Sequence, residues 1–319
     1  MSTLVSTLPQ PFARDAIHGL SQPQKSLPSQ YFYDERGSEL FEQITEQPEY
    51  YPTRTELALL ETCAPEIAET IGPNASIVEY GAGAQRKIRI LLDQLKSPAA
   101  YIPIDVSGPF LRQAADVLDE DYAALDVRPV VGSFMSDSLA VEHPDDADAR
   151  VGFFPGSTLG NLSDDAIVTF LSQVRSHLGK SPRFLLGVDI NQDVGTLIPA
   201  YNDAADITAA FNLNLLVRMN RELEANFDVT AFRHEARWNA DAHRIEMHLI
   251  SEKAQSVSVA GQTFTFAPEE TIHTENSRKF TRDMLDSLCA RSGWTISHEW
   301  ASPGRMMGLY WMEGEPDLK

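Results

Sequence analysis

The middle of the chain alternates short apolar runs with stretches whose apolar residues recur every three or four positions. The apolar runs predict five strands, and the amphipathic stretches predict helices between them. The predicted strands are residues 77–80, 100–105, 127–134, 150–154 and 183–190, and the predicted helices are residues 87–95, 110–118 and 164–178. Strands separated by helices of this length predict a parallel sheet with right-handed crossovers.

The pattern differs on both sides of this core. Residues 1–56 contain no long apolar strand and are rich in tyrosine. Before the sheet we expect a helix over 56–70 that Pro65 kinks or splits. After it we expect helices within 198–227 and a small antiparallel sheet, with alternating residues at 244–251 and 256–266 and a turn at 260–261 within the second of these segments. A helix from 281 that stops at Gly293 and final strands at 295–300 and 306–311 complete the expected elements. The interruption after Asp193 predicts an insertion into the α/β sheet.

The order of these elements predicts two discontinuous domains. We expect an α/β domain from residues 57–193 and 281–319, and a second, α+β domain from residues 1–56 and 194–280. The first domain is expected to bind a cofactor and the second a substrate.

The first predicted strand ends in a glycine turn. Glu79 and Tyr80 are followed by Gly81 and Gly83, and the helical pattern starts directly afterwards. Such a junction lets a nucleotide-like ligand lie against bare backbone, although a plain strand-to-helix turn has the same pattern. A dinucleotide site requires a third glycine, and Arg86 stands in that place, so a dinucleotide is disfavoured.

Two further strand ends narrow the choice of cofactor. Asp105 ends the second strand, where a carboxylate can bind both ribose hydroxyls, and Phe134 ends the third, where an aromatic ring can cover adenine. S-adenosylmethionine has ribose and adenine but no phosphate, so it is the predicted cofactor. Lys87 is expected to face the carboxylate of its methionine part, with a solvated position in the first helical turn as the alternative.

Composition limits the partners and the compartment. The 319 residues carry a formal net charge of −20, which disfavours nucleic acid and anionic membranes as partners. Cys63 and Cys289 lie in apolar helical patterns and are expected to be buried free thiols. No apolar run is long enough to span a membrane, and residues 1–9 lack the pattern of a secretory signal. We therefore expect a cytoplasmic protein, and a monomer because no apolar stripe predicts an interface.

The eight histidines do not predict a metal site. His243 and His248 fall on opposite faces of a strand, and the other histidines are scattered along the chain. The sequence also lacks a G-x-S-x-G nucleophile motif. No metal is therefore expected.

Several segments outside the glycine turn carry a family resemblance that covers about residues 18–312. These segments are residues 25–28, 31–34, 37–41, 48–56, 155–162, 201–205, 208–212, 238–239, 244–247 and 274–280. In order and spacing they resemble the histidine-specific methyltransferases of ergothioneine biosynthesis. The resemblance implies a Rossmann-like class I methyltransferase sheet of seven strands with the last antiparallel, joined to an α+β substrate domain.

The resemblance also implies a reaction and a set of site residues. Members of the family methylate the α-amine of L-histidine three times with S-adenosylmethionine, which gives hercynine. By resemblance, Tyr33, Asn161 and Tyr201 are the catalytic positions that hold the amine and the carboxylate. The remaining substrate positions are Tyr50, Glu275 and Ser277 around the imidazole, Phe41 and Met247 as pocket walls, and Gly156 and Thr158. The implied cofactor positions are Glu79, Gly81, Gly83, Lys87, Asp105, Ser133 and Phe134.

Simpler interpretations remain for individual positions. Asn161 has the spacing of a helix cap, Tyr33 of a surface aromatic, Glu275 of a solvated strand residue, and Phe41 and Met247 of ordinary core. Ser133 departs from the family, which often has an acid there to contact the adenine amine. Two other functions also stay open: an Nα-methyltransferase for another amino acid such as tryptophan, and a non-catalytic relative that only binds a ligand.

Overall fold

The computed structural model describes residues 11–83, 85–136 and 138–315, so the expectation about residues 1–9 lies outside the described part. The chain divides into two compact units. Unit 1 comprises Met1–Tyr51 and Gln192–Arg278, and unit 2 comprises Pro52–Asn191 and Lys279–Lys319. Each unit is therefore built from two separate segments of the sequence.

Unit 2 contains a twisted sheet with the order β13-β14-β7-β6-β2-β3-β4, in which β5 also pairs with β3. Its strands are β2 (Ala75–Tyr80), β3 (Ala100–Asp105), β4 (Asp126–Val127), β5 (Val130–Val131), β6 (Ala149–Phe154), β7 (Arg183–Asp189), β13 (Trp294–Ala301) and β14 (Met307–Gly314). Strands β2 to β7 pair in parallel, and β14 is antiparallel to its neighbours β7 and β13. The predicted α/β fold with an antiparallel last strand is confirmed.

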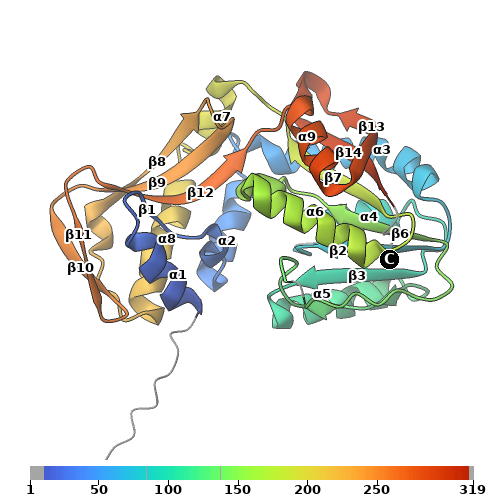
Figure 1. Cartoon of the computed structure of the whole chain (residues 1–319), viewed down its shortest axis with the longest axis horizontal. Coiled ribbons are helices and arrows are strands. Elements are labelled where there is room, and N and C mark those ends of the chain that lie inside the picture. Colours follow the sequence, from blue (N-terminus) through green and yellow to red (C-terminus); the bar gives the residue numbers. More distant parts are fainter. Residues whose placement is uncertain (1–10, 84, 137, 316–319) are drawn as a thin grey trace, which may run out of the picture. The chain divides into compact units, whose positions relative to one another are not determined.

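Helices cover both faces of this sheet. They are α3 (Tyr51–Ile71), α4 (Arg86–Leu92), α5 (Gly108–Asp121), α6 (Asp164–Leu178) and α9 (Arg282–Ser292), with the short turns η2 (Thr158–Asn161) and η4 (Pro303–Arg305). On one face, α6 and α9 lie side by side in front of the strands (Figure 1), and Phe170 packs with Phe154 and Phe184. The alternate positions Ile77 and Tyr101 are fully buried too, as expected for a parallel sheet.

The structure refines two expectations for unit 2. The helix over residues 51–71 runs through Pro65, so it is not split there. The predicted strand 127–134 is reduced to the two short strands β4 and β5, because Pro129 between them has no N–H for the ladder. Phe134 therefore lies in a turn that follows β5 rather than at the end of a strand.

Unit 1 is built from helices, a four-stranded sheet and a two-stranded antiparallel hairpin. The helices are α1 (Pro11–Leu20), α2 (Glu35–Thr45), α7 (Val194–Ala200) and α8 (Ile207–Glu222), with the turns η1 (Ser29–Phe32) and η3 (Val229–Ala231). The four-stranded sheet has the order β1-β12-β9-β8, from β1 (Lys25–Ser26), β12 (Thr271–Arg278), β9 (Arg244–Ser251) and β8 (Phe232–Asn239). In it β1 pairs with β12 in parallel, and the other pairs are antiparallel. The hairpin consists of β10 (Gln255–Val259) and β11 (Gln262–Phe266).

The sheet structure of unit 1 is larger than the small antiparallel sheet that the sequence predicts. Strand β9 lies between β8 and β12, and residues 256–266 belong to the hairpin of β10 and β11, whose turn falls at residues 260–261 as predicted. Strands β8 and β12 have no element predicted for them, because polar and charged residues occupy most of their positions and hide the apolar alternation. Strand β12 matters most, since it carries Glu275 and Ser277.

Two further expectations concern membranes and thiols. Among the helices that the structure describes, none combines the length and the apolar character that crossing a membrane requires. Both cysteines are free thiols, but only Cys289 is buried, whereas Cys63 is partly exposed. Burial raises the pKa of the Cys289 thiol to about 12, which makes it unreactive.

Candidate active site

Three neighbouring parallel strands of unit 2 end at the same edge of the sheet. Strand β2 pairs with β3 on one side and with β6 on the other, both in parallel. Gly81 follows β2, Asp105 ends β3 and Gly156 follows β6. Ligands of open α/β sheets bind outside this carboxyl edge, so the structure brings these predicted residues together where a ligand is expected.

The glycine turn leaves its backbone open. Gly81 has a φ of +72°, a conformation that other residues adopt with strain, and its N–H and that of Ala82 both donate to the carbonyl of Ile104. A Cβ placed on Gly83 would meet nothing within 4 Å. The turn is thus fixed to β3 on one side while the Gly83 backbone faces open space.

Asp105 and Phe134 lie close to this glycine turn: Asp105 directly follows Ile104, whose carbonyl accepts from the turn, and Phe134 contacts the position of Gly81. One carboxylate oxygen of Asp105 accepts the N–H of Ser107 at 2.8 Å, and burial raises the pKa of Asp105. The ring of Phe134 packs on Phe154, and one of its atoms lies 3.6 Å from where a Cβ of Gly81 would be. An acceptor for hydroxyls and an aromatic ring therefore flank the glycine turn.

The hydroxyl of Ser133 makes a local contact. It accepts the backbone N–H of Met135 at 3.2 Å within its own turn, and the residue is exposed. A role of Ser133 toward the adenine amine remains a prediction.

Glu79 is a buried carboxyl at the end of β2. Tyr101 on β3 donates its hydroxyl to this carboxyl in a short hydrogen bond. Burial raises the pKa of Glu79 to about 7, although the Tyr101 hydrogen bond and the charge of Lys87 lower it. Glu79 therefore titrates near neutral pH.

Glu56 is a site residue that sequence reasoning missed. Its carboxylate is 1% exposed, lies 2.5 Å from the ammonium of Lys87, and accepts the N–H of Gly156 at 2.8 and 3.0 Å. Gly156 has a φ of +87°, so this loop conformation also depends on glycine. The only signal for Glu56 in the sequence is its place in the segment 48–56, since a charged residue in a helix is normally solvated.

Asn161 lies at the end of η2, directly before α6. The cap of α6 is Ser163, whose hydroxyl accepts the N–H of Ala166. The simpler interpretation of Asn161 as the cap of this helix is therefore wrong. Thr158 begins η2, so both predicted residues follow β6 within one short turn.

The predicted substrate residues of unit 1 form a continuous aromatic row. Tyr33 contacts Phe41 with ring centroids 5.6 Å apart, Phe41 contacts Tyr50 at 6.3 Å, and Tyr50 contacts Tyr201 at 6.1 Å. Phe211 on α8 packs against Tyr33 and Phe41 from the side. It was not predicted as a site residue, because an apolar position on a helix is normally core.

The row ends at the polar residues of β12. The hydroxyl of Tyr201 and that of Ser277 lie 2.7 Å apart and form a buried hydrogen bond. Glu275 is the register partner of Met247 on β9, which places these two side chains on one face of the sheet. The structure thus brings all the predicted residues of unit 1 into one region.

Tyr33 is held by the residue that follows it. Asp34 caps α2 by accepting the N–H of Gly37, and it also accepts hydrogen bonds from Asn214 and Arg221 of α8. Although 46% of Tyr33 is exposed, desolvation by the surrounding protein raises its pKa well above the ordinary value, and the charge of Glu275 raises it further. The phenol therefore stays protonated at neutral pH.

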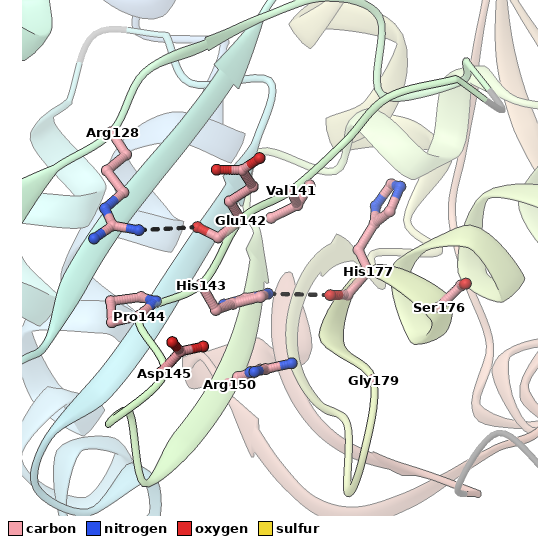
Figure 2. A pocket seen from close by; sticks show the side chains of 10 residues that line it. All are labelled: Arg128, Val141, Glu142, His143, Pro144, Asp145, Arg150, Ser176, His177 and Gly179. Carbon is pink, nitrogen blue, oxygen red and sulfur yellow. Dashed lines mark hydrogen bonds between the residues drawn. The ribbon is translucent and has the colours of Figure 1, made fainter.

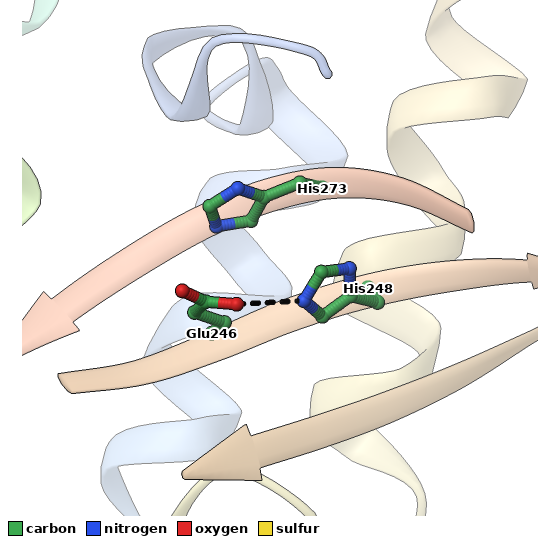
Figure 3. A group of neighbouring side chains, drawn as sticks. All are labelled: Glu246, His248 and His273. Atoms are coloured by element: carbon green, nitrogen blue, oxygen red, sulfur yellow. Dashed lines mark hydrogen bonds and ion pairs between the residues drawn. The ribbon is translucent and has the colours of Figure 1, made fainter. Parts of the chain in front are cut away.

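One group of side chains departs from the expectation that the histidines are scattered. Glu246, His248 and His273 offer ligand atoms that all lie within 4.8 Å of one another (Figure 3). His248 and His273 face each other across β9 and β12, which the sequence could not show without the pairing of the strands.

A polar pocket in unit 2 lies away from the predicted residues. Arg128, Glu142, His143, Arg150 and His177 line it (Figure 2). Arg150 is near the start of β6, and His143 accepts a hydrogen bond from Ser76 near the start of β2. The pocket thus belongs to the amino ends of these strands, opposite the edge of Gly81 and Gly156.

The chemistry of the carboxyl edge fits a methyl donor of the adenosyl type. Gly83 offers open backbone, Asp105 offers acceptors for ribose hydroxyls, and Phe134 offers a ring for adenine. The helix that follows, α4, begins with Arg86 and has no third glycine for a pyrophosphate.

Comparison with known proteins agrees with this chemistry. The model of the family "Histidine-specific methyltransferase, SAM-dependent" matches residues 12–314. The chain is 41% identical to the histidine N-alpha-methyltransferase of Mycolicibacterium smegmatis over 301 residues, or 93% of this chain and 92% of that protein. The enzyme of the same name from Mycobacterium tuberculosis is 37% identical with the same coverage. A 4-dimethylallyltryptophan N-methyltransferase from Aspergillus fumigatus is 24% identical, covering 92% of this chain and 91% of its own length.

Fold, glycine turn and family match together define a methyltransferase that uses S-adenosylmethionine. Within that class, the chain belongs to the family of histidine-specific, S-adenosylmethionine-dependent methyltransferases. The resemblance found in the sequence is confirmed.

Proposed function

We propose that the protein methylates the α-amine of L-histidine three times and so produces hercynine for ergothioneine biosynthesis. The observation that carries this proposal is the arrangement of unit 1, where an aromatic row from Tyr33 ends at hydrogen-bonded Tyr201 and Ser277. Glu275 lies on the same strand as Ser277. The relatives named for histidine methylation match nearly the whole chain, which supports the same substrate.

The aromatic and polar groups suit a free histidine. A neutral imidazole offers one donor and one acceptor, so the carboxylate of Glu275 can accept from one nitrogen while a hydroxyl donates to the other. Tyr50 and Ser277 are the hydroxyl groups that we assign to this task. Phe41 and Met247 supply the apolar walls around the ring.

The other end of the amino acid needs different partners. We assign the amide of Asn161 and the phenol of Tyr201 to the substrate carboxylate and amine. S-adenosylmethionine, when bound, supplies an electrophilic methyl group. The amine must be neutral to accept it, so the nitrogen has to lose one proton to water before each transfer, and each transfer leaves S-adenosylhomocysteine. Tyr33 keeps its proton at neutral pH and therefore acts by orienting the amine rather than as a strong base.

We assign the methyl donor to the carboxyl edge of the unit 2 sheet. In this proposal Asp105 binds the ribose, Phe134 covers the adenine, and Gly81 and Gly83 admit the nucleoside to the backbone. Lys87 is paired with Glu56 and helps to shape the loop at Gly156. A cytoplasmic monomer without nucleic-acid or membrane partners remains our expectation, in line with the net charge of −20.

The experiment that tests the proposal is incubation of the purified protein with S-adenosylmethionine and each common amino acid in turn, followed by mass spectrometry. Histidine alone should give a product heavier by three methyl groups. A methylated tryptophan or other amino acid would instead favour the related activity. The absence of any methylated product would favour a non-catalytic relative. An Asn161→Ala variant, prepared in parallel, controls for methylation by contaminating enzymes.

A further inference from the structure

Strand β12 contains a bulge directly before Glu275. His273 is the register partner of His248 on β9, but Glu275, two residues later, is the partner of Met247, the next residue on β9. Thr274 is the extra residue in this stretch. A bulge of this kind places two residues of one strand opposite one residue of its neighbour.

The bulge decides which side chains share a face. In a regular strand, His273, Glu275 and Ser277 would all point to the same side. Because of the extra residue, Glu275 and Ser277 lie on the same face of the sheet as Met247 of β9. His273 stays on the opposite face with His248 and Glu246, the group drawn in Figure 3. The inserted residue thus places the proposed substrate residues, Glu275 and Ser277, on the opposite face of the sheet from His273.

Two side chains hold the bulge in place. Nε2 of His273 lies 3.0 Å from the backbone carbonyl of Glu275, and the hydroxyl of Thr274 donates to the carbonyl of Met247 at 3.0 Å. Since a carbonyl oxygen only accepts, Nε2 of His273 must carry the proton. Thr274 is 2% exposed, so its hydrogen bond is shielded from water.

The ring of His273 is itself held by its neighbours. It stacks on His248 with centroids 4.9 Å apart and an angle of 19° between the planes. Nε2 of His248 donates to the carboxylate of Glu246 at 3.1 Å, and Glu246 also accepts from Arg244. Because the rings of His248 and His273 are stacked, the lone pairs of their nitrogens lie in two nearly parallel planes rather than pointing to one shared position. Arg244 already forms an ion pair with the carboxylate of Glu246. This arrangement suits a fixed imidazole better than a shared metal ion.

We infer that His273 is a positioning residue that, together with Thr274, sets the face on which β12 presents Glu275 and Ser277 to the substrate. The inference rests on the proposed role of these two residues in binding the histidine imidazole. His273 itself does not touch the substrate; it acts through the backbone of Glu275. Loss of the hydrogen bond between His273 and the backbone of Glu275 should therefore weaken only the contribution of Glu275 and Ser277 to histidine binding.

A double-mutant cycle between His273→Ala and Glu275→Ala tests this inference, with kcat and KM measured for histidine. In the otherwise unchanged enzyme, His273→Ala should lower kcat/KM by roughly ten- to hundredfold, mainly through KM, because the carboxylate is misplaced. In the Glu275→Ala background the same change should cost clearly less than in the unchanged enzyme, because only the contribution of Ser277 is left to lose and coupled residues are not additive. Thr274→Val, which removes only the hydroxyl, should behave like His273→Ala, and His273→Gln should restore part of the loss. Thr271→Ala, on the same strand before the bulge, serves as the matched control and should leave kcat/KM unchanged.

The outcomes separate the inference from the proposed function. Equal losses in both backgrounds, or no loss from His273→Ala in the unchanged enzyme, would overturn the positioning role alone. A wild-type protein that does not methylate histidine would overturn the proposed function, and the inference with it. Calorimetric binding of S-adenosylhomocysteine should be the same for all variants if the effect is confined to the histidine side. Should His273→Ala not fold, Thr274→Val in both backgrounds completes the same cycle.

Discussion

The ammonium of Lys87 lies 2.5 Å from the carboxylate of Glu56, a side chain that is only 1% exposed. The same carboxylate accepts the N–H of Gly156, so one buried acid links the helix after β2 to the loop after β6. Both segments carry residues that we assign to the active site. The pair therefore ties the glycine turn to the loop of Thr158 and Asn161.

The first prediction follows from this link. Glu56→Gln keeps an acceptor for the N–H of Gly156 but leaves the largely buried Lys87 without its counter-charge. We expect a loss of about 1–3 kcal/mol in the free energy of unfolding, measured in urea, together with weaker binding of S-adenosylhomocysteine. Adding Lys87→Met should recover part of the stability. Unchanged stability in Glu56→Gln would contradict a structural role for the pair.

A second buried pair lies at the end of β7. The ammonium of Lys279 is 2.7 Å from the carboxylate of Asp189, and both side chains are fully buried. Lys279→Met leaves the buried carboxylate without this partner, which should cost about 3–5 kcal/mol in the free energy of unfolding. The matched control is Lys253→Met, which breaks a surface pair with Asp228 and should leave the free energy of unfolding nearly unchanged. Similar losses of unfolding free energy in the two variants would show that burial does not determine how much these ion pairs contribute to stability.

The apolar pattern of the sequence predicts some strands and helices of the fold and misses others. Strands β3 and β7 are apolar on both faces, so their runs are visible, and the helix at residues 164–178 has a clear amphipathic period. Strand β12 is not visible, because its polar side chains are satisfied by neighbouring strands that only the folded chain brings together. Pro129 divides the predicted third strand by a local rule that the apolar pattern does not include.

The candidate site divides in the same way. Gly81 and Asp105 can be predicted because they follow visible strands, whose carboxyl ends meet at one edge. Glu56 and His273 cannot be predicted in this way. Glu56 acts from within a helix on a loop a hundred positions away in the chain, and the role of His273 depends on a bulge that exists only in the paired strands.

A third prediction concerns stability in acid. The pKa of His248 is lowered to about 4, mainly by burial. The charges of His273 and Arg237 also lower this pKa, whereas the hydrogen bond to Glu246 raises it. The folded state thus favours the neutral ring, and its contribution is complete above the unfolded pKa of about 6.5 and is lost as the pH falls toward 4. From the difference of these pKa values we expect a loss on the order of 3 kcal/mol from His248.

The measurement is the free energy of unfolding in urea between pH 7 and pH 4. His248→Gln removes the titrating group and should fall less steeply over this range than the wild type. His18→Gln, which replaces an exposed histidine, should follow the wild-type curve. Parallel curves for wild type and His248→Gln would mean that His248 does not couple protonation to folding.

The last prediction concerns the choice of histidine over other amino acids. Glu275 lies beside Met247 on the face that we assign to the imidazole. In Glu275→Ala, one imidazole nitrogen of bound histidine loses its partner, which should cost about 1–3 kcal/mol in transition-state stabilisation, or roughly a 5- to 150-fold loss of kcat/KM. Glu269→Ala, which removes an exposed carboxylate near the start of the same strand, is the matched control and should keep the wild-type value. Because the site assigned to the methyl donor is unchanged, calorimetric binding of S-adenosylhomocysteine should keep its wild-type Kd, so a loss confined to kcat/KM for histidine is the decisive readout. If Glu275→Ala used histidine as efficiently as the wild type does, the imidazole would have to be bound elsewhere.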